Sequence, residues 1–212
     1  MRRRRFSRGA RRTIEWMADP LYLSLWFPDF EEPSLLPHTL EVLKEFPFST
    51  QRPGISAVAV HPVSWSEPTI LERQFNPGIQ PVEAMEVVSD LLHADYAYVF
   101  RAYWDLWRAD ASGAWSKGPH AMSFTAHGLN FEDGTYEENG HILVDFGLDT
   151  DFLFEEVEFT GEAEEHIREN VALLIAFTLA VEKNSGIRGR VLWSESEENL
   201  AQKLVARLQK TQ

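Results

Sequence analysis

The sequence contains no cysteine among its 212 residues. This absence excludes disulfide bonds, thiolate nucleophiles and cysteine-ligated zinc. It also fits the reducing environment of the cytoplasm, where we expect the protein to reside.

Long apolar segments are lacking as well. The longest, residues 171–181, is interrupted only by Thr178 and is too short to span a bilayer. Residues 1–12 contain no apolar core of the kind that a secretory signal needs. We therefore expect a soluble protein without a transmembrane segment.

Several common catalytic motifs are missing. The chain has no Gly-x-Ser-x-Gly, no His-Glu-x-x-His and no phosphate-binding loop, which argues against the common hydrolase and NTPase families. The Asp-Phe-Gly triplet at residues 145–147 resembles the metal-binding triplet of protein kinases, but the Gly-rich loop and the His-Arg-Asp motif that accompany it there are absent. No motif in the chain identifies a family.

Charge is distributed unevenly along the chain. Residues 1–12 hold seven of the 20 Lys and Arg residues and no acid, which leaves 13 basic against 33 acidic residues and a formal charge of −20 for the rest. Because the chain after residue 12 is so acidic, it repels phosphate backbones, and we expect this folded part to bind no nucleic acid. Residues 1–17 are interpreted as a disordered basic arm, either an extension preceding a start at Met17 or, if native, a contact for anionic surfaces.

The remaining sequence has the composition and periodicity of a folded α+β protein. Hydrophobic residues make up 44% of the chain, including 7 Trp and 14 Phe. Period-two patterns predict strands at residues 21–27, 55–63, 69–75, 96–107, 121–128, 141–148 and 190–193. Helical spacing predicts helices at residues 34–46, 81–92, 162–183 and 194–208, and a loop is expected at residues 108–119.

The order of these elements predicts two ferredoxin-like halves. Residues 18–108 give β-α-β-β-α-β, the ferredoxin-like split unit, and residues 109–212 give β-β-α-β-α, a related or truncated copy. We expect an antiparallel sheet with helices mainly on one face. The other face is then covered either by the other half or by a second copy of the chain.

The tripeptide Trp-Ser-Glu occurs twice, at residues 65–67 and 193–195. At the second copy, Ser194 and Glu197 have the spacing of a helix capping box, which favours a structural role. The first copy is followed by Pro68 and a strand pattern, so it is interpreted as a turn in which Trp65 is a candidate binding residue.

The predicted hairpin formed by residues 121–128 and 141–148 carries the best candidate site. If its apolar residues face the core, His127 lies opposite His141 or Leu143, with Asp145 nearby. Two imidazoles and a carboxylate are suited to bind a divalent metal or to act as an acid–base pair. The alternative is an ordinary solvated sheet face.

The leading functional expectation is a non-catalytic binding or interaction module with a protein partner, most simply a second copy of itself. The expected contact residues are Trp65, Tyr103, Trp104 and Trp107. The competing expectation is an enzyme, or a metal- or haem-binding protein, with a pocket between the halves. Its candidate residues are His127, His141, Asp145 and Glu67, and haem binding would use His166. No cofactor is predicted by the leading interpretation.

Overall fold

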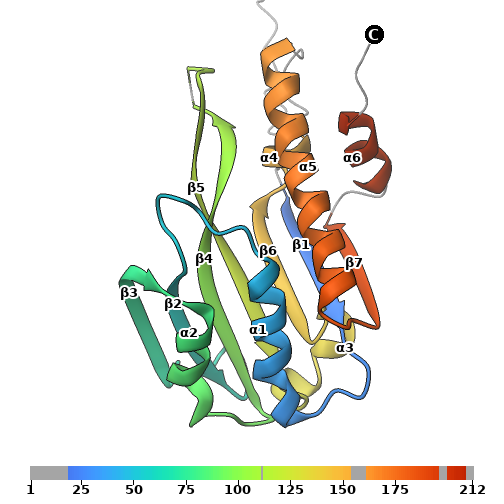
Figure 1. Cartoon of the computed structure of the whole chain (residues 1–212). Coiled ribbons are helices and arrows are strands. Elements are labelled where there is room, and N and C mark those ends of the chain that lie inside the picture. Colours follow the sequence, from blue (N-terminus) through green and yellow to red (C-terminus); the bar gives the residue numbers. More distant parts are fainter. Residues whose placement is uncertain (1–18, 111, 154–160, 196–199, 209–212) are drawn as a thin grey trace, which may run out of the picture.

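A computed structural model of the chain describes residues 19–110, 112–153, 161–195 and 200–208. Its strands are β1 (Pro20–Trp26), β2 (Ile55–Pro62), β3 (Leu71–Ile79), β4 (Tyr96–Ala109), β5 (Trp115–His127), β6 (Ile142–Leu148) and β7 (Gly189–Ser194). All seven form one antiparallel sheet in the order β3-β2-β4-β5-β6-β1-β7. The protein is therefore an α+β protein built on a single sheet (Figure 1).

The α-helices are α1 (Leu35–Glu45), α2 (Pro81–Ser89), α3 (Tyr136–Asn139), α4 (Thr150–Leu153), α5 (Gly161–Asn184) and α6 (Leu200–Leu208), with short 3-10 helices η1 (Glu32–Ser34) and η2 (Phe131–Asp133). Local chemistry explains the start of α2, where Pro81 occupies the first helical position and Glu83 accepts a hydrogen bond from the Gln80 N–H at 2.7 Å. Among the described residues, no helix is both long and apolar enough to cross a membrane.

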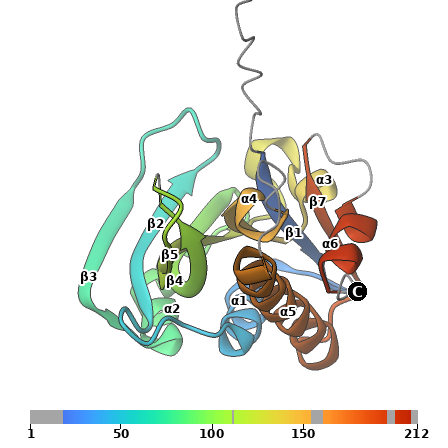
Figure 2. The same ribbon diagram turned by 90° about the horizontal axis from the view of Figure 1, so that it is seen from above.

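The core lies between the sheet and helices α1, α2 and α5, which lie side by side against it (Figures 1 and 2). On β4, the alternate residues from Tyr98 to Leu106 are buried and face these helices. Trp104, 2% exposed, is packed edge-on by Phe46 at the end of α1 and Phe177 of α5. The aromatic residues that are abundant in the sequence thus join helices and sheet.

The sheet order does not confirm two ferredoxin-like halves. A self-contained β-α-β-β-α-β unit pairs its first strand within the unit, but β1 pairs with β6 and β7 from the second half of the chain. The two segments also join through the long β4–β5 pairing. The order of the strands and of helices α1, α2, α5 and α6 was predicted from the sequence, whereas the short helices α3 and α4 were not. The partner of β1 was not predicted either, because strand pairing leaves no local pattern.

The loop expected at residues 108–119 is largely a β-hairpin. Ala109 pairs with Trp115, and the β4–β5 pairing continues without a shift to His127. Asp110 stabilises the turn, since its Oδ1 accepts hydrogen bonds from the backbone N–H groups of Ser112 and Ala114. The Ser and Gly residues in this segment therefore belong to a tight turn and a strand.

The face of the sheet opposite α1, α2 and α5 carries two rows of cross-strand neighbours. From β7 to β3, the first row is Trp193, Tyr22, Asp145, Ser123, Arg101, Ala57 and Gln74. The second is Val191, Ser24, Leu143, Thr125, Val99, Ala59 and Glu72. Apart from Leu143, the side chains in the middle of the second row are small or β-branched. Arg101 in the first row and Val191 in the second are exposed. We call this surface the second face.

Asn170 of α5 links three elements through a fully buried amide. Its Oδ1 accepts a hydrogen bond from the Trp107 N–H at 2.9 Å, and its Nδ2 donates to the carbonyl oxygens of Trp107 and Asp151. Removing the amide leaves these backbone groups without partners in the interior.

We expect Asn170→Ala to lower the free energy of unfolding by about 2–4 kcal/mol, because buried polar groups lose their hydrogen bonds. Leu179→Ala, at a 52% exposed position of the same helix, is the control and should change it by less than about 0.5 kcal/mol. Urea denaturation measures both. Equal decreases in the free energy of unfolding in the two variants would show that Asn170 does not link these elements.

Candidate ligand-binding site

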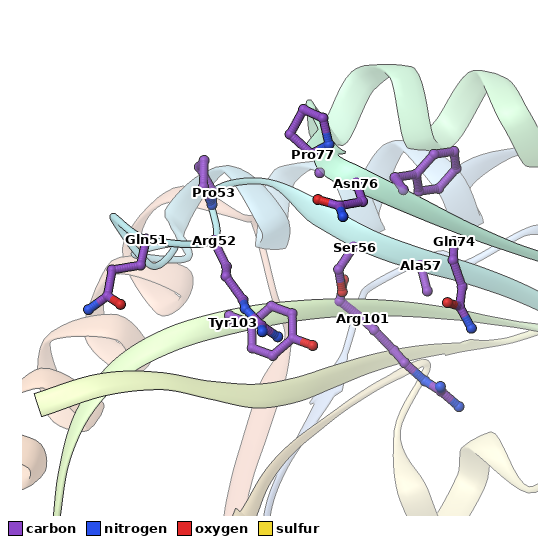
Figure 3. A pocket seen from close by; sticks show the side chains of 12 residues that line it. Gln51, Arg52, Pro53, Ser56, Ala57, Gln74, Asn76, Pro77, Arg101 and Tyr103 are labelled. Atoms are coloured by element: carbon purple, nitrogen blue, oxygen red, sulfur yellow. The ribbon is translucent and has the colours of Figure 1, made fainter.

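A cavity of about 460 Å³ lies on the second face where β2, β3 and β4 meet the loop before β2. Figure 3 shows the side chains around it. The lining residues are Gln51, Arg52, Pro53, Ser56, Ala57, Gln74, Phe75, Asn76, Pro77, Gly78, Arg101 and Tyr103. Two of these twelve described residues are arginines and none is an acid.

The loop before β2 is fixed to β4 by hydrogen bonds. The Ser49 N–H donates to the Tyr103 carbonyl oxygen at 2.7 Å, and the Thr50 N–H donates to Asp105 Oδ2 at 2.9 Å. Ser49 Oγ in turn accepts hydrogen bonds from the N–H groups of Gln51 and Arg52, both at 3.1 Å. This network places Arg52 at the rim of the cavity.

An irregularity in β2 and β3 makes room for the cavity. Pairing between β2 and β3 is regular from Ala57 to Val60, but Ile55 pairs with Ile79, so the chain from Phe75 to Gly78 bulges opposite Ser56. The Asn76–Pro77 peptide bond in this bulge is cis. The bulged segment forms one wall of the cavity.

Two glycines allow the walls to approach each other. A Cβ on Gly78 would lie 2.4 Å from the Pro53 carbonyl oxygen, and a Cβ on Gly54 would lie 2.3 Å from the Ile79 carbonyl oxygen. Gly54 also has a φ of +78°, which side-chain-bearing residues rarely adopt. The shape of this corner of the sheet therefore depends on glycine at both positions.

The cations of the cavity come from different elements. The Arg52 guanidinium lies over the Tyr103 ring at 4.7 Å from its centroid, and the exposed Arg101 side chain extends from β4 (Figure 3). Within the described part of the chain, neither arginine is within 4.0 Å of a carboxylate oxygen. Their positive charge is therefore not neutralised by a close acid of the described chain.

The two hairpin histidines are adjacent in the backbone but have different ring environments. The His127 N–H donates to the His141 carbonyl oxygen at 2.9 Å, so they are opposite each other, in one of the two expected registers. The His127 ring lies beside Trp65 and Phe131, and its Nδ1 donates to the Gly140 carbonyl oxygen at 2.9 Å. The contacts that hold the His127 ring are therefore different from those that hold the His141 ring.

The His141 ring stacks on Phe30 at 3.8 Å, and its Nδ1 accepts a hydrogen bond from the Phe27 N–H at 3.0 Å. Burial lowers the pKa of His141 to about 4, with further lowering by His38 and His127. His127 likewise has a lowered pKa because it is buried. Both side chains are thereby kept neutral in the folded protein at neutral pH.

The two carboxylates of the candidate catalytic set lie elsewhere. Asp145 pairs with Ser123, further along the hairpin, and its Oδ1 accepts a hydrogen bond from the Gly147 N–H at 2.8 Å. Glu67 is exposed in the turn between β2 and β3. Among the residues that the structure describes, no three His, Asp or Glu side chains form a group able to hold a metal ion.

The two Trp-Ser-Glu segments have different environments. Trp65, 44% exposed, contacts His61 and Phe131, and its backbone N–H donates to Glu132 Oε1 at 3.1 Å. Ser194 ends β7, and its hydroxyl donates to Asp149 Oδ2 at 3.3 Å. Glu197, the other half of the expected capping box, lies outside the described residues.

The other expected contact residues separate into three environments. Tyr103 lines the cavity. Trp104 is buried in the core, which removes it from the accessible surface. Trp107 stacks on His166 at 3.8 Å and donates its Nε1–H to Glu169. His166 also lies against Trp115, so both strands of the β4–β5 hairpin contact α5 near the turn.

Sequence reasoning did not find most of the cavity. Residues 51–54 looked like an ordinary loop, and the cavity forms only because a bulge in β3 approaches that loop. The available signals were Tyr103, which was expected as a contact residue, and Arg101, a cation in the middle of an aromatic strand on the side away from the core.

Comparison with known proteins gave no matching family model, no similar curated protein and no similar solved structure. Function is therefore inferred from the geometry of this chain.

Burial of His141 predicts a specific pH dependence of stability. The unfolded chain binds a proton at this residue near pH 6.5, whereas the folded chain binds it near pH 4. The contribution of His141 to the free energy of unfolding is therefore fully present above about pH 6.5. It decreases as the pH falls toward 4, by about 3 kcal/mol at most. His141→Asn should flatten the profile of unfolding free energy in this window.

Denaturant unfolding between pH 4 and pH 7 measures the effect, with His93→Asn as the control at a 55% exposed side chain. His93→Asn should keep the wild-type slope. If His141→Asn keeps it too, the buried imidazole is not the source of the pH dependence.

Proposed function

We propose that the protein is a binding module whose recognition surface is the second face of the sheet and whose ligand occupies the cavity at β2, β3 and β4. The observation that carries this proposal is the cavity itself, about 460 Å³ in volume, of whose twelve lining residues seven have polar side chains. Its size falls within the range of small-molecule sites. Its walls are fixed by the Ser49 hydrogen bonds and by the close approach at Gly78, so a ligand meets a preformed site.

Blocking the cavity tests this function. Gln74 is exposed on β3 and lines the cavity, so Gln74→Trp should fill it without disturbing the core. Glu72→Trp is the matched control, because Glu72 is exposed on the same strand and the same face but does not line the cavity. A library of small polar molecules, screened by ligand-observed NMR, should give compounds that bind the wild type and Glu72→Trp but not Gln74→Trp.

Two results would contradict the proposal. One is that no compound binds the wild-type protein. The other is that bound compounds are retained by Gln74→Trp, because they would then occupy another part of the surface.

A second contact region on the same face is suited to self-association. On β1, β6 and β7, the rings of Tyr22 and Trp193 lie 4.7 Å apart, Leu143 is half-buried, and Val191 is 50% exposed. Burying such side chains against an equivalent sheet face is a common way to form a symmetric dimer. This region is separate from the residues that line the cavity.

Sedimentation equilibrium tests self-association. Val191→Glu places a charge on the second face and should shift the protein toward monomer, by about tenfold or more in dissociation constant, because the charge would be desolvated in the contact. Val82→Glu, at a 51% exposed position of α2, should not. A monomeric wild type, or equal effects of the two variants, would contradict self-association through this region.

A further inference from the structure

We propose that the ligand of the cavity is a small organic anion, a molecule with carboxylate or phosphate groups, held by Arg52 and Arg101. This inference rests on the proposed function, since it assigns a ligand class to the same cavity. It goes further by naming the side chains that select the ligand.

Arg52 is positioned before any ligand arrives. Its backbone N–H is bound to Ser49 Oγ, and its guanidinium lies over the Tyr103 ring. Stacking on an aromatic ring occupies the flat face of a guanidinium and leaves the N–H groups at its edge free to donate. A carboxylate or phosphate accepts two such hydrogen bonds at once.

Arg101 supplies a second cation from the floor of the cavity. Its cross-strand neighbours on the second face are the small residues Ala57 and Ser123, so its long side chain extends from β4 without a bulky neighbour at either flank. Figure 3 shows it leaving the sheet on the Gln74 side, whereas Arg52 lies over Tyr103. Cations at two places along the cavity fit a molecule with more than one anionic oxygen centre.

The other polar groups around the cavity can donate hydrogen bonds to an anion, although they can also accept them. Gln51, Gln74 and Asn76 carry amide N–H groups, and Tyr103 carries a phenol. Acids of the second face lie just outside the lining. Glu72 is two residues from Gln74 on β3, and Asp105 accepts hydrogen bonds from Thr50 through Oδ2.

The positive lining of the cavity differs in sign from the net charge of the chain. The chain has a formal net charge of −13, with 33 acids against 20 Lys and Arg. A cavity lined by two arginines and no acid therefore has the opposite charge to the chain as a whole. Such a local reversal of sign concentrates anions at the site while the remaining surface repels them.

Isothermal titration of the full chain with three probes tests the inference: succinate, inorganic phosphate, and the neutral succinamide. The wild type should bind succinate or phosphate saturably, more weakly at higher salt, and succinamide at least tenfold more weakly. Arg52→Gln and Arg101→Gln should each weaken anion binding by tenfold or more, because each removes a charged hydrogen-bond donor.

Arg188→Gln is the matched control. Arg188 is exposed just before β7, which forms the edge of the sheet opposite β3 and the cavity. It should leave anion binding within twofold of wild type. Circular dichroism confirms that the glutamine variants are folded.

The inference is overturned if neither anion binds the wild type, or if binding persists in both Arg52→Gln and Arg101→Gln. It is also overturned if Arg188→Gln weakens binding as much as they do. Neutral compounds that bind the wild type but not Gln74→Trp would keep the proposed function while removing the anion assignment. If neither anions nor neutral compounds bind, both fail.

Discussion

The antiparallel pairing of β4 with β5 is the constraint on which the rest of the structure depends. It runs without interruption from Ala97 opposite His127 to Ala109 opposite Trp115. One side of β4 supplies the core that meets α1 and α5, and the other side supplies Arg101 and Tyr103 to the cavity. Because side chains alternate between the faces of a strand, a shift of one residue in this pairing would exchange the two sets.

The regular centre of the sheet contrasts with its irregular corner. Between β2 and β4 the pairing shifts at Ser56, and between β2 and β3 it shifts at the same residue. Bulges of this kind interrupt pairing and redirect side chains, and they are frequent next to functional sites. Here the bulge, the Gly78 approach and the Ser49 hydrogen bonds together create a polar cavity beside an otherwise continuous sheet.

The sequence was a good guide to elements and a poor guide to pairing. The patterns of apolar residues and the end signals of the helix predicted β1, β2, β6 and α5 closely, because burial imposes such patterns on the chain. The pairing of β1 with β6 and β7 was not predictable, since partners far apart in sequence leave no local signal. The hairpin turn at Asp110 was mistaken for a loop because its Ser and Gly residues are typical of both.

For the candidate site, too, the sequence indicated individual residues but not how they come together. His127 was expected opposite His141 or Leu143, and its backbone lies opposite His141, but the His141 ring stacks on Phe30 whereas the His127 ring lies beside Trp65. Tyr103 was expected as a contact residue and lines the cavity, whereas Arg52 was not singled out. Its role depends on a loop, a bulge and a ring that meet only in the folded chain.

Anomalous diffraction from crystals soaked in selenate tests the central claim most directly, since selenate is a tetrahedral oxyanion whose selenium atom can be located without bias. We predict a selenium peak in the cavity, with oxygens within hydrogen-bond distance of Arg52 or Arg101. Selenate bound at other surface sites, with the cavity empty, would contradict it.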